Sequence, residues 1–288
     1  MKTIIPVIGI LLVVSCTSEE NASIFTGDKQ TYCVEIPNGK KNANREEYVV
    51  HGDMGNYASF MSKSDSEIGI SSSRYYPLGE ETVTAFYSPS DVTDTKSHIN
   101  DEFAYKIRIN EKAVFSSTTK SEPGSIKEMF GGPVSFSFSE DNPQTKVAHG
   151  IVNLYVPKIV RINFPEVVSE DNRYPLCYYK DFVVRWNEDS ANKDGIIVFV
   201  KWSGIMVFGE DYSSSYIYHI IRVPDSGSTI LDETMFEGIP DTAYCSLGLL
   251  RGVSENIEFN DETIKVLAES HDILDFVLVR NIVSNEDV

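Results

Sequence analysis

Apolar and polar residues alternate along several stretches of this chain, and the alternation predicts β-strands. Over residues 103–110, aromatic or aliphatic side chains occupy every second position, and Lys106, Arg108 and Asn110 lie between them. Residues 134–139 alternate Val or Phe with Ser in the same way. A period of two is typical of a strand with one buried and one solvent-exposed face. Beyond the first apolar run, no helical periodicity extends past two or three turns.

Short strands separated by turn residues follow one another from residue 30 onward, which is typical of β-sandwiches. Residues 196–202 are almost wholly apolar, as expected for a central strand covered on both faces. Helical turns are expected at 125–130 and after Asp232, a favoured N-cap residue. Further strands are predicted at 31–36, 47–50, 82–87, 151–156, 159–164, 182–186, 205–208, 216–223, 228–231, 242–250, 262–268 and 275–279.

A crossing at Pro157 leads from one predicted strand straight into the next, with no flexible run between them. Such a crossing suggests two stiffly joined domains. We therefore expect an all-β protein with two β-sandwich domains, at residues 29–157 and 158–288. Over about 159–282, seven or more strands with Trp186 and Trp202 resemble an immunoglobulin or fibronectin type III-like sandwich.

An export signal precedes these strands. Lys2 is followed by an apolar run at 4–14, about eleven residues, whereas a membrane-spanning helix needs roughly twenty. The tetrapeptide Val13-Val14-Ser15-Cys16 resembles the lipobox of bacterial lipoproteins. This resemblance implies that residues 1–15 are a lipoprotein signal peptide and that Cys16 carries the lipid. An uncleaved anchor or a plain secreted protein is the alternative. Residues 16–28 are polar and acidic and are interpreted as a tether.

The first residues after the lipobox, Cys16-Thr17-Ser18-Glu19-Glu20, resemble the short serine-plus-acidic signal of Bacteroidetes surface lipoproteins. The resemblance implies an outer-membrane location, a lipid anchor at Cys16 that makes the membrane a partner, and exposure to the cell exterior. A signal followed by two β-domains also resembles the Bacteroidetes surface lipoproteins of uncharacterised role.

The charge of the chain argues against nucleic acid as a partner. It has 25 basic and 43 acidic side chains, a formal net charge of −18, and no stripe of Lys or Arg. Such a surface repels a polyanion. The acidity is explained by solubility, with cation binding as an alternative.

No arrangement of residues indicates catalysis or a cofactor. The five histidines are scattered, and neither zinc-ligand spacing, nor a Gly-x-Ser-x-Gly elbow, nor a phosphate-binding glycine loop is present. Residues 187–195 follow only part of a calcium-loop pattern, and its twelfth position is Lys201 instead of Glu. We interpret them as a hairpin turn, and we expect no metal site, cofactor or catalytic residue.

Cys177 and Cys245 lie in the same predicted domain and are the candidates for a disulfide, which export to an oxidising space would permit. Two buried free thiols are the alternative, since cysteine also behaves as a small apolar residue. Cys33 is expected to be unpaired if Cys177 and Cys245 form the disulfide.

Tyrosines in predicted loops are the candidates for ligand recognition, because each ring offers an apolar face and a polar hydroxyl. They are Tyr174, Tyr178, Tyr179, Tyr212 and Tyr216. The alternative is that they cover the ends of the sandwich.

The favoured function is a non-catalytic, surface-held binding or adhesion module for an extracellular glycan or protein. One alternative is a structural subunit of a fimbria-like assembly, for which Lys41 or Arg45 would offer a protease site. A third is a polysaccharide-processing enzyme.

Overall fold

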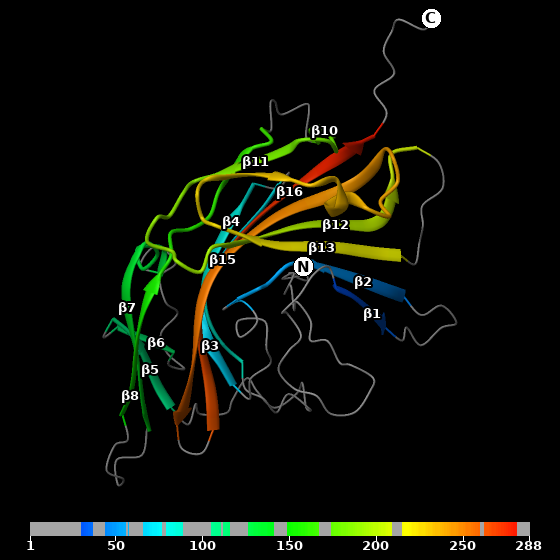
Figure 1. The fold of residues 1–288 in the computed structure, drawn as a ribbon. Helices are drawn as coiled ribbons and strands as arrows, with labels where there is room; N and C mark the ends of the chain where they lie inside the picture. The colour runs from blue at the N-terminus through cyan, green and yellow to red at the C-terminus, as the bar shows by residue number, and fades with distance from the viewer. Residues whose placement is uncertain are drawn as a thin grey trace, which may run out of the picture.

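A computed structural model describes residues 30–36, 44–55, 57, 66–76, 79–88, 105–110, 112–115, 126–140, 149–166, 174–208, 215–259 and 262–280. Strands dominate this part of the chain, which confirms the all-β class (Figure 1). The strands are β1 (Gln30–Ile36), β2 (Asn44–His51), β3 (Ser66–Tyr76), β4 (Glu81–Ser88), β5 (Tyr105–Ile109), β6 (Lys112–Phe115), β7 (Gly132–Glu140), β8 (His149–Val156), β9 (Ile162–Phe164), β10 (Leu176–Tyr178), β11 (Phe182–Trp186), β12 (Ile196–Met206), β13 (Ser215–Val223), β14 (Ser228–Leu231), β15 (Ala243–Phe259) and β16 (Glu262–Val279). One 3₁₀ helix, η1 (Glu233–Phe236), follows Asp232, whose side chain accepts a hydrogen bond from the backbone N–H of Thr234 as predicted for a cap.

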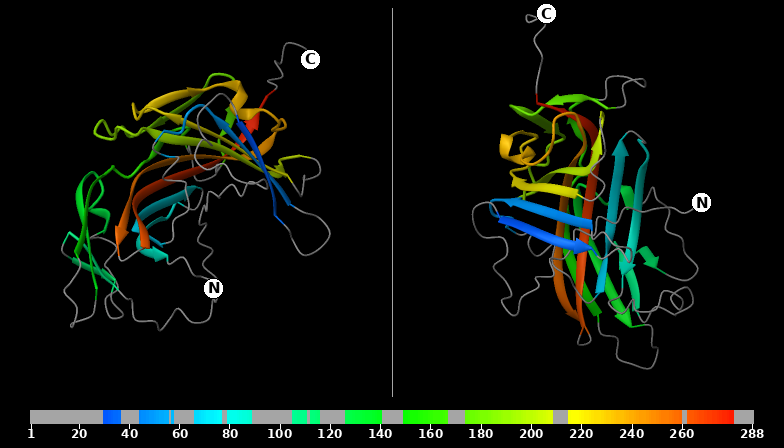
Figure 2. Two further views of the ribbon diagram at one scale, coloured as in Figure 1. Left: turned by 60° about the horizontal axis from the view of Figure 1, so that its bottom comes forward. Right: turned by 90° about the vertical axis from the view of Figure 1, so that its right-hand side faces the viewer.

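The strands form one large sheet and two small ones. The large sheet has the order β1-β2-β13-β12-β15-β16-β3-β4, and β10 pairs with β16 beside this path. Most neighbours are antiparallel, but β2 with β13, β3 with β16, and β10 with β16 are parallel. Figures 1 and 2 show that the large sheet is arched and that both small sheets lie on its outer side.

Each small sheet encloses a hydrophobic core with the large sheet, so the sandwich architecture is confirmed. The first core lies under β14-β11-β9, contains Trp186 and Trp202, and is built from buried residues between Val160 and Leu278. The second lies under β6-β5-β7-β8 and contains Val134 and Phe136, as their alternation predicted. A third cluster, with Tyr57 and Phe199, lies on the inner face of the large sheet.

Strand pairing over residues 158–280 forms a β-sandwich. Its two layers are the small sheet β9-β11-β14 and the part of the large sheet formed by β13, β12, β15 and β16. The interior faces of both sheets are apolar along β11 and β12, where Val184 and Val200 are buried. The number, length and spacing of these strands predict a β-sandwich, which the structure confirms, and their resemblance to an immunoglobulin or fibronectin type III domain stays a prediction.

The β15–β16 hairpin is shared by both sandwiches. Its strands have 17 and 18 residues, which corresponds to roughly 55 to 60 Å of extended chain. Its far end contributes Ile264, Val266 and Ala268 to the core under β7 and β8. The large sheet contains strands from both sides of the boundary expected near Pro157, because β2 pairs with β13 and β3 pairs with β16. Periodicity indicates strands but does not specify which distant strand each will pair with.

β3 and β12 are among the elements that differ from those expected. β3 was not predicted, because its sequence SEIGISSSRYY has only two aliphatic residues, Ile68 and Ile70, which are nevertheless fully buried. The strands expected at 196–202 and 205–208 were to be separated by a turn at Ser203-Gly204, but this turn lies within β12, where Gly204 adopts a φ of 80° and the register with β15 shifts. A glycine in this left-handed region allows a β-bulge instead of a strand end.

Candidate functional site

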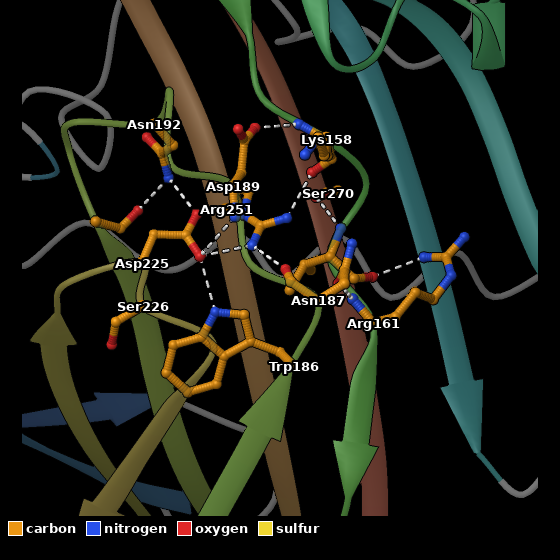
Figure 3. Close-up of polar contacts among 12 residues, drawn as sticks. Lys158, Arg161, Trp186, Asn187, Asp189, Asn192, Asp225, Ser226, Arg251 and Ser270 are labelled. Atoms are coloured by element: carbon orange, nitrogen blue, oxygen red, sulfur yellow. Dashed lines mark hydrogen bonds and ion pairs between the residues drawn. The ribbon is translucent and has the colours of Figure 1, made fainter.

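A buried polar network lies where the two sandwiches meet (Figure 3). Arg251 on β15 and Asp225, after β13, form an ion pair of 2.7 Å between Nη2 and Oδ1, with side chains 0 % and 1 % exposed. The Trp186 indole donates to the same carboxylate oxygen at 2.8 Å, and Asn192 donates to the other oxygen at 2.9 Å. The Nε of Arg251 has no hydrogen-bond partner among the described residues.

Arg251 also ties the junction together through backbone carbonyls. Its guanidinium donates to the carbonyls of Lys158 (2.9 Å) and Asn187 (2.6 Å), which lie in the crossing and after β11. A buried charge is stable only when it is paired and hydrogen-bonded, and these contacts meet that requirement for two of the three guanidinium nitrogens. We therefore interpret the network as a structural joint.

Asp189 connects the loop after β11 to the other sandwich. Its carboxylate accepts hydrogen bonds from the Tyr155 hydroxyl on β8 (3.0 Å) and from the backbone N–H groups of Lys158 (2.8 Å) and Ala191 (3.2 Å). Burial alone would raise the pKa of Asp189, but these hydrogen bonds and the nearby Arg251 outweigh it and lower the pKa. The carboxylate is thus ionised and saturated by protein donors.

The loop that partly follows a calcium pattern is used for these internal contacts. Asn192 donates to the carbonyl of Gly195 at 2.6 Å, and its own Oδ1 accepts from the N–H of Asp194, as in an Asx turn. Gly195 has a φ of 80°, which a hairpin turn requires. Across the described residues, no group of three or more His, Cys, Asp or Glu side chains could hold a metal ion.

Two further ion pairs link strand β3 or β4 to segments that follow Pro157. Asp272 on β16 is fully buried and receives two bonds from Arg74 on β3, at 2.7 and 2.6 Å, in a bidentate pair. Arg161 binds Glu81 at the start of β4 at 2.5 Å. These pairs join the strands that precede Pro157 to those that follow it.

A partly exposed group of side chains on β3, β15, β16 and the turn before β10 offers a surface for recognition. We call Tyr75, Tyr174, Tyr244, Ser246 and Asp275 the tyrosine–carboxylate cluster. The Tyr75 hydroxyl donates to Asp275 Oδ2, and the Ser246 hydroxyl donates to Oδ1 at 2.6 Å. The rings of Tyr174 and Tyr244 meet edge to face, with centroids 5.4 Å apart. Tyr75 and Tyr174 are each 36 % exposed.

The strand register places this cluster on the inner face of the arch. Ser246 pairs with Asp275, and Tyr244 pairs with Val277, which in turn pairs with Leu176. Residues two apart on a strand share a face, so these side chains lie on the face opposite the small sheets. Leu176 is 72 % exposed and Tyr178 on the same strand is 37 % exposed. Aromatic and apolar surface therefore continues from the cluster along β10.

The predicted tyrosines do not form one site. Tyr174 belongs to the cluster, and Tyr178 extends its exposed surface. Tyr179 instead packs against the core under β11, with Lys180 and Arg280 near its ring. Tyr216 lies on β13 and pairs with Glu46 on β2. Strands β12, β15 and β16 separate β13 from β10, so Tyr216 is remote from the cluster. Tyr212, Cys16 and the whole of 1–29 lie outside the described residues.

Cys177 and Cys245 are both free and buried, so the disulfide considered for them is absent from the structure. Cys177 is on β10 and Cys245 on β15, with β16 between them. Strands two places apart are separated by about 9.5 Å, and a disulfide needs Cα atoms within about 7 Å. Both residues instead fill the core as small apolar groups.

Of the five residues of the cluster, only Tyr174 was predicted from the sequence, and Tyr75, Tyr244, Ser246 and Asp275 were not. Tyr75 is the second-last residue of β3, a strand that the sequence pattern did not predict, so it was not expected to lie in a sheet. Asp275 stands alone in the apolar stretch ILDFV, and a single carboxylate in such a stretch would have been the usable signal, because a half-buried carboxylate needs donors nearby.

Comparison with protein families, with curated proteins and with solved structures gives no match. Among the helical segments that the structure describes, none has the length and apolar character to cross a membrane.

Proposed function

We propose that this chain is a lipid-anchored, non-catalytic binding protein of the outer membrane that faces the cell exterior. The observation that carries the binding role is the tyrosine–carboxylate cluster, where two tyrosines remain exposed around a carboxylate held by two hydroxyl donors. Aromatic rings combined with a few fixed polar groups are typical of ligand sites. The ligand class is an extracellular glycan or protein.

The proposed location in the outer membrane is supported by the lipobox resemblance and by the acidic residues that follow Cys16. A single acyl chain binds membranes weakly, whereas the two or three chains of a processed lipoprotein give a stable anchor. A Cys16→Ser variant is expected to leave the membrane fraction and to keep its far-ultraviolet circular dichroism spectrum. Retention of this variant in the membrane fraction contradicts the anchor.

The binding role is tested with whole cells that carry the wild-type protein or lack it. Carriers are expected to adhere to some members of a panel of immobilised extracellular glycans and matrix proteins, and cells without the protein are not. Equal adhesion of both strains contradicts a binding role. Polymer ladders in unheated gels would favour the assembly subunit instead, and release of reducing ends from a polysaccharide panel would favour an enzyme.

A further inference from the structure

We infer that the tyrosine–carboxylate cluster is a binding site for a neutral, hydroxyl-rich saccharide. This inference rests on the proposed binding function and assigns it a ligand chemistry and a set of atoms. The cluster is built by β3, β15, β16 and the turn before β10, so residues far apart in sequence meet there.

The carboxylate of Asp275 is held in place and still has acceptor capacity. A carboxylate has about four lone-pair directions, and the Tyr75 and Ser246 hydroxyls occupy one on each oxygen. Both donors keep the group from rotating. Two directions are then available for the hydroxyl groups of a ligand, and paired acceptors of this kind suit neighbouring hydroxyls on a sugar ring.

The Tyr75 phenol stays protonated in this setting. Burial raises the pKa of Tyr75, and the hydrogen bond to the Asp275 carboxylate raises it further. Its hydroxyl therefore acts as a donor to Asp275 throughout the physiological range and keeps one oxygen lone pair for a ligand hydroxyl.

Tyr174 and Tyr244 supply the apolar half of the site. Their edge-to-face contact holds the two rings at an interplanar angle of 70°, and the Tyr174 ring remains partly exposed. A sugar ring has an apolar face of C–H groups, which packs against an aromatic ring while its hydroxyls reach polar neighbours. The distance between β15 and β3 across β16 is about 9.5 Å, which is enough for a sugar ring to touch both halves.

The charge of the site favours neutral over acidic saccharides. Asp275 is the charged member of the cluster, and the whole chain has a net charge of −18. Lys201, which pairs with Ser246 on the side away from Asp275, holds its ammonium over the Tyr218 ring at 5.2 Å. A uronic or sialic acid carboxylate would therefore meet Asp275 at close range and be repelled.

The test uses the full lipid-bearing protein in detergent micelles and an array of neutral, amino-substituted and acidic oligosaccharides, followed by titration of those retained. We expect neutral saccharides to be retained. Tyr174→Ala and Asp275→Asn should each weaken binding at least tenfold, and Tyr75→Phe should weaken it several-fold. Ile230→Ala, an exposed change on the outer sheet, is the matched control and should bind like the wild type.

Three results would overturn the inference. They are retention of acidic saccharides alone, retention of no saccharide, and neutral binding that both Tyr174→Ala and Asp275→Asn leave unchanged while their melting temperatures match the wild type. In each case the cell-adhesion comparison separates the two proposals. If adhesion still depends on the protein, the binding role stands and only the saccharide site fails.

Discussion

Phe199 on β12 lies directly over Gly248, its partner on β15, so that a Cβ atom added at Gly248 would come within 1.9 Å of the phenyl ring. The ring fills the space that a side chain would otherwise occupy on the inner face of the sheet, and Phe199 is part of the core cluster there. Gly248 is thus required by packing against a neighbour.

Replacing Gly248 with Ala is expected to destabilise the protein by about 1–3 kcal/mol, because the ring must move out of a packed position. Urea denaturation measures the change. Gly132→Ala on β7 is the matched control, since a Cβ there meets nothing within 4 Å. Adding Phe199→Leu to Gly248→Ala should cost less than the sum of the two single changes. Strict additivity would contradict the proposed contact.

The Arg251–Asp225 pair makes a second prediction. Asp225→Ala leaves a fully buried guanidinium without its counter-charge and removes the acceptor of the Trp186 indole. Breaking such a pair costs about 3–5 kcal/mol. Chemical denaturation should show this loss, whereas Glu255→Ala, a change at an exposed residue of β15, should alter stability by less than about 0.5 kcal/mol. A loss below about 1 kcal/mol for Asp225→Ala would mean that the joint is not needed for folding.

Asp189 gives a pH-dependent prediction. Its folded-state pKa is lowered, so the stability it contributes is present above the unfolded-state pKa of about 3.9 and is lost as pH falls through the lower folded-state value. Asp189→Asn should therefore be less stable than the wild type at pH 7, by about 1–3 kcal/mol. The difference should narrow below about pH 4. A difference that is the same at pH 7 and pH 3 would show that the ionised carboxylate is not what holds the junction.

The two free cysteines predict a pattern of thiol reactivity. Burial raises the pKa of Cys177 to about 12 and also raises that of Cys245, so few thiolates form at neutral pH. In a Cys16→Ser, Cys33→Ala background, a thiol reagent should label both residues in denaturant, and label them slowly in the folded protein. Absence of labelling in denaturant without reductant would instead indicate a disulfide.

Residue patterns predicted the strands better than their partners. The alternation at Val134 and Phe136 identified a half-buried strand, because the period of two is set locally by the pleat. Residues 269–274, with the polar run Glu269 to Asp272, were expected to separate two strands, yet they lie inside β16. Those polar residues are tolerated because they have partners nearby: Arg74 on β3 binds Asp272, and the N–H of Val160, in the segment before β9, donates to Ser270.

In the candidate site, too, the sequence predicted a local feature but not the long-range contacts. Tyr174 was predicted to take part in recognition because an aromatic residue in a turn is visible in sequence. Tyr75 and Asp275 were not, since they are 200 residues apart and meet only because β3 pairs with β16. Long-range pairing depends on the packing of whole sheets, which a single sequence does not display.

The hairpin formed by β15 and β16 limits how this protein can be divided for study. A fragment that begins after Pro157 would keep every buried residue of the core under β14-β11-β9. It would also carry a bare end of the hairpin, with Ile264, Val266 and Ala268 stripped of the sheet that covers them. Exposed apolar strand surface of that kind promotes aggregation. Domain-by-domain expression is therefore a poor route to this molecule, and both sandwiches are better kept in one chain.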